Sequence, residues 1–163
     1  MTGARPAALF VLIACNSLGG LDVETFPDQG ASHVPPDTQP EYNSEPPTSG
    51  PHVQAWAPCG IYRQEVPDLL QVHDLEHGVV MVQYDPEISN EDRRALEDLG
   101  RALGDHIIVA PRSGMTGPVV LTAWTKLLRL EEVNEEAIRA FYREFAGSGP
   151  ERVPCPFEFD ESA

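Results

Sequence analysis

The sequence predicts an α+β domain: one open sheet of three to five strands, helices packed mainly on one face, and a proline-rich extended arm in front. Three observations support this prediction. In roughly the last 100 residues, short apolar β-branched runs alternate with amphipathic stretches of helical period. Eight prolines fall within residues 16–58, where neither a helix nor a central strand is expected. One sheet with helices on it is the simplest arrangement that buries the apolar side of each stretch.

The start of the chain has the composition of a secretory signal peptide, which we assign to residues 1–14. Arg5 is its one charged side chain, and the apolar core that follows is too short to cross a bilayer. The order Leu-Ile-Ala-Cys that ends at Cys15 resembles the lipobox of bacterial lipoproteins, in which the cysteine is lipidated and begins the mature protein. We therefore expect an extracytoplasmic lipoprotein anchored to a bacterial membrane through Cys15. An ordinary cleaved signal, or an apolar start with a chance cysteine, is the alternative.

The remaining chain divides into two parts. Residues 15–58 carry the anchor cysteine and the arm, which we expect to lie extended against the domain surface, because proline rings fix φ and remove backbone donors. Residues 59–163 are expected to form a single domain. Their apolar residues recur with regular periods, and their length is enough for one core.

The first elements of this domain are short. Residues 61–62 predict a brief strand, and residues 67–77 predict one or two helical turns. Pro67 suits a first helical position, and Gly78 suits a left-handed stop. Residues 79–84 are apolar, β-branched and followed by Asp-Pro, so they predict a buried strand.

Two amphipathic helices and two further strands complete the domain. Ser89 and Asn134 are the expected N-caps of the helices, and each helix ends before a glycine. Residues 106–110 and 119–124 predict strands between them, so the order is strand, helix, strand, strand, helix. The apolar stripes of the two helices are Leu96, Leu99 and Leu103, and Ile138, Phe141, Tyr142 and Phe145.

The charge balance narrows the choice of partners. The chain has 26 Asp and Glu against 11 Lys and Arg, a formal net charge of -15. Such acidity repels phosphate backbones and anionic headgroups, so a nucleic-acid partner is excluded and membrane contact has to come from the lipid. It attracts cations, although in many acidic proteins it serves only solubility. No particular protein partner is indicated.

With Cys15 lipidated, Cys59 and Cys155 remain as an even pair in an oxidising compartment. An even number of cysteines in such a compartment predicts a disulfide. In the chain-entropy model, a bond that closes a loop of this length contributes up to about 4 to 5 kcal/mol. Two separate thiols acting as soft metal ligands are the competing interpretation.

His73 and His77 are four residues apart with Glu76 between them. Residues i and i+4 share one face of a helix, so both imidazoles can reach a single ion, and Glu76 stays on the same side. The spacing favours a metal site.

Several segments together carry a family resemblance. They are residues 42–52 (YNSEPPTSGPH), 59–62 (CGIY), 72–78 (VHDLEHG) and 119–124, which end in Thr-Ala-Trp. With these motifs the chain resembles a bacterial family known as domain of unknown function 3105, found largely in secreted or membrane-tethered proteins. The resemblance covers nearly the whole mature chain and implies motifs rather than a reaction. It also implies a histidine near His33 and a cysteine near the tail, which supports the pairing of Cys155.

Four of the five histidines therefore become candidate ligands. If the arm folds back over the sheet edge, His52 can complete a three-histidine site with His73 and His77, and His33 can be the fourth ligand. Glu76 is then an additional ligand or fixes an imidazole tautomer. His106 lies outside the shared motifs and is expected to be ordinary.

Imidazole ligands suit copper or zinc. Met81 and Met115 would add thioether sulfur and favour Cu(I) if either pointed at the site, which gives copper a slight advantage. For Met81, core packing is the simpler interpretation, because it lies within a buried strand. Trp56 and Trp124 are expected to be packing anchors.

The proposed metal binder or carrier has two competitors. In one, the histidines are structural ties that hold the arm, and the lipoprotein binds another protein or a small ligand. In the other, residues 73–77 are the H-x-x-E-H motif of a zinc-dependent hydrolase with Glu76 as general base. Gly78 argues against a hydrolase, because it ends the helix immediately. We therefore expect no enzyme, no catalytic residues and no organic cofactor.

Overall fold

The computed structural model describes residues 16–18 and 20–155. The predicted signal peptide and Cys15 lie outside these residues. Within them the chain forms, in order, β1 (Asn16–Leu18), β2 (Leu21–Thr25), β3 (Gly60–Ile61), α1 (Asp68–Glu76), β4 (Val80–Tyr84), α2 (Asn90–Leu103), β5 (Ile107–Pro111), β6 (Val119–Ala123), β7 (Lys126–Leu130) and α3 (Glu135–Phe145).

The strands form one mixed, open sheet. Six of them lie in the order β2-β7-β6-β4-β5-β3, and β1 pairs only with β2 at the edge. β4 is central, parallel to β5 and antiparallel to β6, and each of its residues is buried. The predicted α+β class and single open sheet are confirmed, whereas the predicted three to five strands are too few.

Two of the missed strands have a physical reason for being missed. β2 lies within the residues that we assign to the proline-rich arm, and although Leu21 and Val23 alternate with Asp22 and Glu24, the strand has only five residues and only Val23 is buried. β7 follows β6 through a tight turn in which Thr125 has φ 61°. That conformation is typical of Gly or Asn, so with a threonine at this position the sequence does not predict a turn.

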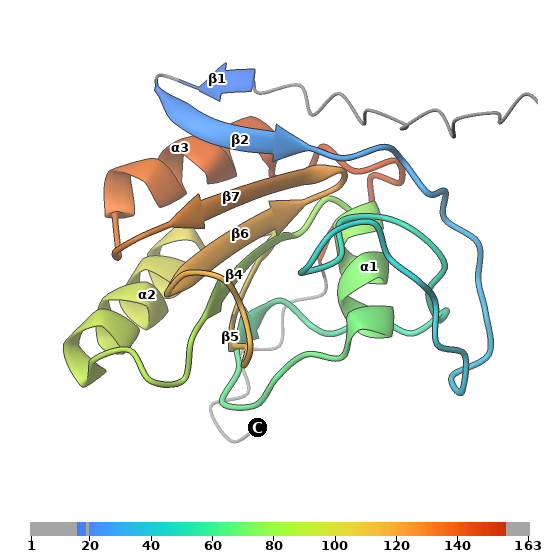
Figure 1. The fold of residues 1–163 in the computed structure, drawn as a ribbon, viewed down its shortest axis with the longest axis horizontal. Coiled ribbons are helices and arrows are strands. Elements are labelled where there is room, and N and C mark those ends of the chain that lie inside the picture. The colour runs from blue at the N-terminus through green and yellow to red at the C-terminus, as the bar shows by residue number, and fades with distance from the viewer. Residues whose placement is uncertain (1–15, 19, 156–163) are drawn as a thin grey trace, which may run out of the picture.

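The helices lie on both faces of the sheet, with α2 and α3 on one side and α1 on the other (Figure 1). Side chains alternate along β4, so Val80 and Val82 pack under α2 and α3 while Met81 packs under α1 with Leu75 and Ile108. Two of the three helices share a face, in keeping with the prediction of helices mainly on one face.

Local signals explain α2 and α3 well. The side chain of Ser89 accepts a hydrogen bond from the Asp92 N–H at 3.0 Å, and the side chain of Asn134 accepts one from the Ala137 N–H at 3.0 Å. α1 differs, because Pro67 precedes it without a side-chain cap. It also buries polar residues, namely Gln71, His73, Asp74 and Glu76.

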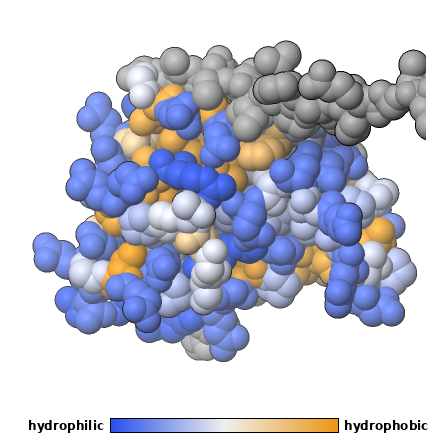
Figure 2. Space-filling view, viewed as in Figure 1, coloured by the Kyte–Doolittle hydropathy of each residue, from blue (hydrophilic) through white to orange (hydrophobic). Residues whose placement is uncertain are grey.

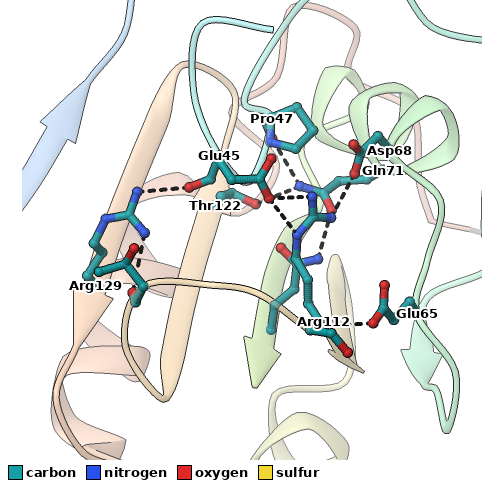
Figure 3. A network of polar contacts seen from close by, with 11 residues as sticks. Glu45, Pro47, Glu65, Asp68, Gln71, Arg112, Thr122 and Arg129 are labelled. Atoms are coloured by element: carbon teal, nitrogen blue, oxygen red, sulfur yellow. Dashed lines mark hydrogen bonds and ion pairs between the residues drawn. The ribbon is translucent and has the colours of Figure 1, made fainter. Parts of the chain in front are cut away.

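Residues 26–59, the β2–β3 segment, loop around α1 (Figure 1). Polar contacts hold them there (Figure 3). Arg112, at the end of β5, donates to the Glu45 carboxylate at 2.6 Å and to that of Asp68 at 2.7 Å. Gln71 donates to the Pro47 carbonyl at 3.0 Å, and Arg129 donates to the Glu45 carbonyl at 2.8 Å. The segment is thus fastened to α1, β5 and β7.

The face seen in Figure 2 is mostly hydrophilic, with smaller hydrophobic areas between the polar side chains. This agrees with the acidic composition. Among the described residues, no helix combines the length and the apolar character that crossing a bilayer requires.

Cys59 and Cys155 form the predicted disulfide, with their Cα atoms 6.0 Å apart. The bond joins residues 96 apart in sequence and ties the chain just before β3 to the tail after α3. Both cysteines are buried in the core under α1. The alternative of two separate thiol ligands is therefore wrong.

Replacing both cysteines, Cys59→Ala with Cys155→Ala, should lower the free energy of unfolding by about 2 to 5 kcal/mol, because the unfolded chain regains the entropy of the open loop. Guanidinium unfolding followed by circular dichroism measures the change. The wild-type protein in reductant is the matched control and should unfold with the variant. Equal stability of the variant and the oxidised protein would contradict this stabilising role.

Candidate metal centre

The second half of α1 supplies most of the candidate site. His73 is 4% exposed, Glu76 5% and His77 9%, while the apolar residues of this turn, Val72 and Leu75, are fully buried. His77 is the C-cap residue of the helix. Burying polar groups costs free energy unless they find partners, so a helix that buries this many requires something to contact them.

The β2–β3 segment brings the other two histidines. A parallel bridge pairs His33 with His52: the His52 N–H donates to the Ser32 carbonyl at 3.0 Å, and the Val34 N–H donates to the His52 carbonyl at 2.8 Å. The His52 ring centroid lies 5.1 Å from that of His33 and 4.9 Å from that of His73. The rings of His73 and His77 are 4.4 Å apart. The structure thus brings the four predicted histidines together.

Backbone carbonyls orient two of these rings. Nδ1 of His73 donates to the Val53 carbonyl at 2.7 Å, and Nδ1 of His52 donates to the Gly50 carbonyl at 2.9 Å. Since a carbonyl oxygen only accepts, both Nδ1 atoms carry a proton. In the neutral ring Nε2 then has a free lone pair. This is the tautomer that a metal-ligating histidine needs, held by the partner it usually has.

The ε nitrogens converge. Nε2 of His77 donates a hydrogen bond to Nε2 of His73 at 3.0 Å, because the proton of the His73 ring is on Nδ1, and Nε2 of His52 lies 3.0 Å from Oε2 of Glu76. His52 Nε2 is nevertheless buried without a hydrogen-bond partner, since the close carboxylate is not aligned with it. Neighbouring donors of a tetrahedral ion with bonds of about 2.0 to 2.1 Å are about 3.3 Å apart, close to these separations. The donor set fits a transition-metal ion.

Two overlapping groups of three donors result. We call His33, His52 and His73 the outer trio, and His73, Glu76 and His77 the inner trio. In each trio one donor atom per residue lies within 4.8 Å of the others. His33 is the exposed member, whereas the other four residues are at most 9% exposed. His73 belongs to both trios.

Burial favours the neutral form of two candidate ligands. Desolvation lowers the pKa of His52 and that of His77; neighbouring imidazoles lower both further, while Glu76 opposes the shift at His52 and Glu151 opposes it at His77. Both rings are therefore neutral at pH 7. Neutral rings offer their lone pairs without first losing a proton.

The loop after α3, which no sequence motif predicts, closes the back of the site. Gly78 has φ 86°, and a Cβ there would lie 2.8 Å from the Gly147 backbone. Gly147 donates to the Gly78 carbonyl at 2.8 Å, and the Glu151 N–H donates to the Glu76 carbonyl at 3.0 Å. The Glu151 carboxylate then lies 3.6 Å from Nε2 of His77.

Trp56 is a second residue whose place the sequence did not indicate. Its ring centroid lies 5.8 Å from that of His73 and 6.0 Å from that of His77. It is 48% exposed, so the prediction of a packing anchor was wrong for this residue. Trp124, by contrast, packs against the core under α1. The fluorescence of an indole at this position is also a probe of binding at the site.

The structure places one of the two predicted sulfur ligands in the core. Met81 is fully buried there with Leu75 and Ile108. Met115 is partly exposed in the loop between β5 and β6. His106, as predicted, is apart from the cluster, with Asp105 and Val153 as its contacts.

A family model described as "Protein of unknown function (DUF3105)" matches residues 33–156. The chain belongs to the DUF3105 family. The match to DUF3105 begins at His33 and extends past Cys155, so both trios and the disulfide fall within it. No curated protein and no solved structure matches the chain.

Asp74, buried beside His73 in this DUF3105 domain, should make stability depend on pH. Burial raises the pKa of its carboxyl well above the usual range, although the Ala57 N–H that it accepts opposes the shift. The folded protein thus holds this proton more tightly than the unfolded chain, whose aspartates titrate near about pH 3.9.

As pH rises from about 4, the free energy of unfolding of the metal-free wild type should therefore fall relative to that of Asp74→Asn, which has no proton to lose. Urea unfolding of both proteins in the presence of a chelator, across a pH series, measures the difference. A difference that stays constant with pH would contradict the raised pKa.

Proposed function

We propose that this DUF3105 protein is an extracytoplasmic lipoprotein that binds one transition-metal ion through His33, His52, His73 and His77, with Glu76 as a further donor. One observation carries the proposal. The Nδ1 protons of His52 and His73 are fixed on backbone carbonyls, so the lone pair of each buried ring is on Nε2. That atom lies 3.0 Å from Oε2 of Glu76 in His52 and 3.0 Å from Nε2 of His77 in His73.

A purely structural role accounts for His73, whose two ring nitrogens are both hydrogen-bonded, but it accounts less well for His52. A histidine that only ties the β2–β3 segment to α1 gains by using both ring nitrogens in hydrogen bonds. Nε2 of His52 instead faces the Glu76 carboxylate, and in the neutral ring both atoms are acceptors. Two acceptors 3.0 Å apart in a buried site repel each other, and either a proton or a bound metal ion removes that repulsion.

The chemistry of the donors favours Cu²⁺ first and Zn²⁺ second. The two trios offer imidazole nitrogens and a carboxylate oxygen, which suit both ions, and Cu²⁺ binds such sites more tightly. With Met81 in the core, its thioether sulfur gives no support to Cu(I). The net negative charge favours the approach of either cation.

Anchoring belongs to the same proposal. Lipid attached to Cys15 would hold the domain at a bacterial membrane, directly before β1. A binder or carrier suits this arrangement better than a hydrolase. α1 is nine residues long and Gly78 follows it, whereas a catalytic H-x-x-E-H motif belongs in a longer helix.

A second candidate function rests on a cleft of about 380 Å³ between α1 and the loop before it. Its volume suits a small ligand, and its lining is largely apolar with charged groups at hand. The lining residues are Ala57, Tyr62, Arg63, Gln64, Glu65, Val66, Pro67 and Leu70. Ligand binding there would need none of the four histidines.

Replacing His73 and His77 by Ala should lower Cu²⁺ and Zn²⁺ affinity at least about 100-fold, because the change removes the shared ligand and one inner ligand. Elemental analysis after dialysis and competition titration of residues 16–163 measure stoichiometry and affinity. The wild type should hold about one ion per chain.

His106→Asn is the matched control, because His106 lies outside the cluster and Asn tolerates its φ of 48°. It should bind as the wild type does. The single variant His77→Gln, which leaves the His73 contact to Val53 intact, guards against misfolding of the double variant. Unchanged stoichiometry and affinity in folded variants would rule out the site.

A further inference from the structure

The two trios differ in a way that points to how an ion is exchanged. This inference rests on the proposed function. We propose that the two trios are alternative positions for a single ion: the exposed outer trio takes up and releases it, and the inner trio holds it. His33 is then an exchange ligand, and His73 stays bound in both positions.

The two positions cannot be filled together. His73 is common to both trios, and its Nδ1 is used in the hydrogen bond to the Val53 carbonyl at 2.7 Å. It therefore offers Nε2 alone. An imidazole nitrogen has one lone pair, so His73 serves one ion at a time. The five donors accordingly specify one ion per chain and not two.

The inner trio is the better resting place. It contains the Glu76 carboxylate, so it neutralises part of the charge of a divalent cation, whereas the outer trio consists of three imidazoles. All three inner residues are at most 9% exposed, and charge interactions are stronger away from water. The Nε2 atoms of His73 and His77 are also already 3.0 Å apart.

The outer trio is the accessible one. His33 is exposed, and its ring stacks on His73 with the centroids 5.4 Å apart. A ligand from solution or from another protein can replace His33 without disturbing the core. The step between the positions is short, because His73 is shared and His52 of the outer trio lies 3.0 Å from Glu76 of the inner one.

Kinetics separates this arrangement from a simple four-histidine site. A ligand that acts only during exchange alters uptake and release by the same factor, which leaves the equilibrium affinity unchanged. A ligand that binds the resting ion alters the affinity, and most of that effect is faster release. His33→Ala distinguishes the two cases, and its exposure makes the substitution compatible with folding.

The experiment uses the protein from residue 16 with Cu²⁺ alone. Stopped-flow mixing follows uptake by the quenching of Trp56, which lies beside the inner trio, and release by transfer to excess chelator. His33→Ala should slow both processes by about 10-fold or more with Kd within about threefold of the wild type. His77→Ala should instead weaken Kd and speed release. His106→Asn should match the wild type in all three quantities.

Three results would overturn the proposal. Faster release with weaker Kd in His33→Ala would make His33 an ordinary fourth ligand, and rates equal to those of His106→Asn would give it no role. Two ions per chain would contradict the shared ligand. Absence of Cu²⁺ binding by the wild type in the initial titration would refute the proposed function itself. Failure of the exchange scheme is a different result, because the wild type then still binds Cu²⁺.

Discussion

The hydrogen bond from His73 Nδ1 to the Val53 carbonyl is the contact on which the candidate site depends. At 2.7 Å it joins α1 to the β2–β3 segment, and it determines which nitrogen of the ring remains free. It acts in the middle of the cluster, because His73 is the member that the two trios share. The tautomer of the ring that the two trios share thus follows from one backbone carbonyl on a segment without regular secondary structure.

The rest of the fold keeps that segment in place at a cost in stability. α1 buries His73, Asp74 and Glu76 where apolar side chains would pack more favourably. The contacts of Arg112 with Glu45 and Asp68, together with the disulfide, offset part of this cost by fastening the segment and the tail. The sheet with α2 and α3 thus holds the larger apolar core, while the opposite face holds the buried polar cluster.

Much of the fold follows from local signals. Ser89 and Asn134 mark α2 and α3, and the apolar β-branched run marks β4, because caps and periodicity act over a few residues. β7 escapes because its turn places Thr125 at positive φ. In the site, the i, i+4 spacing indicates His73 and His77, and the family resemblance adds His33 and His52. Glu151 and Trp56 could not be foreseen, since they arrive through long-range backbone contacts that leave no sequence pattern.

The disulfide also has a consequence for the order of assembly. Cys155 is four residues after Glu151, so its bond to Cys59 confines the stretch of tail that closes the back of the inner trio. A chain with free thiols lacks that restraint on the tail. If the proposed function holds, oxidation would be a maturation step that completes the cluster in the compartment where the two thiols pair.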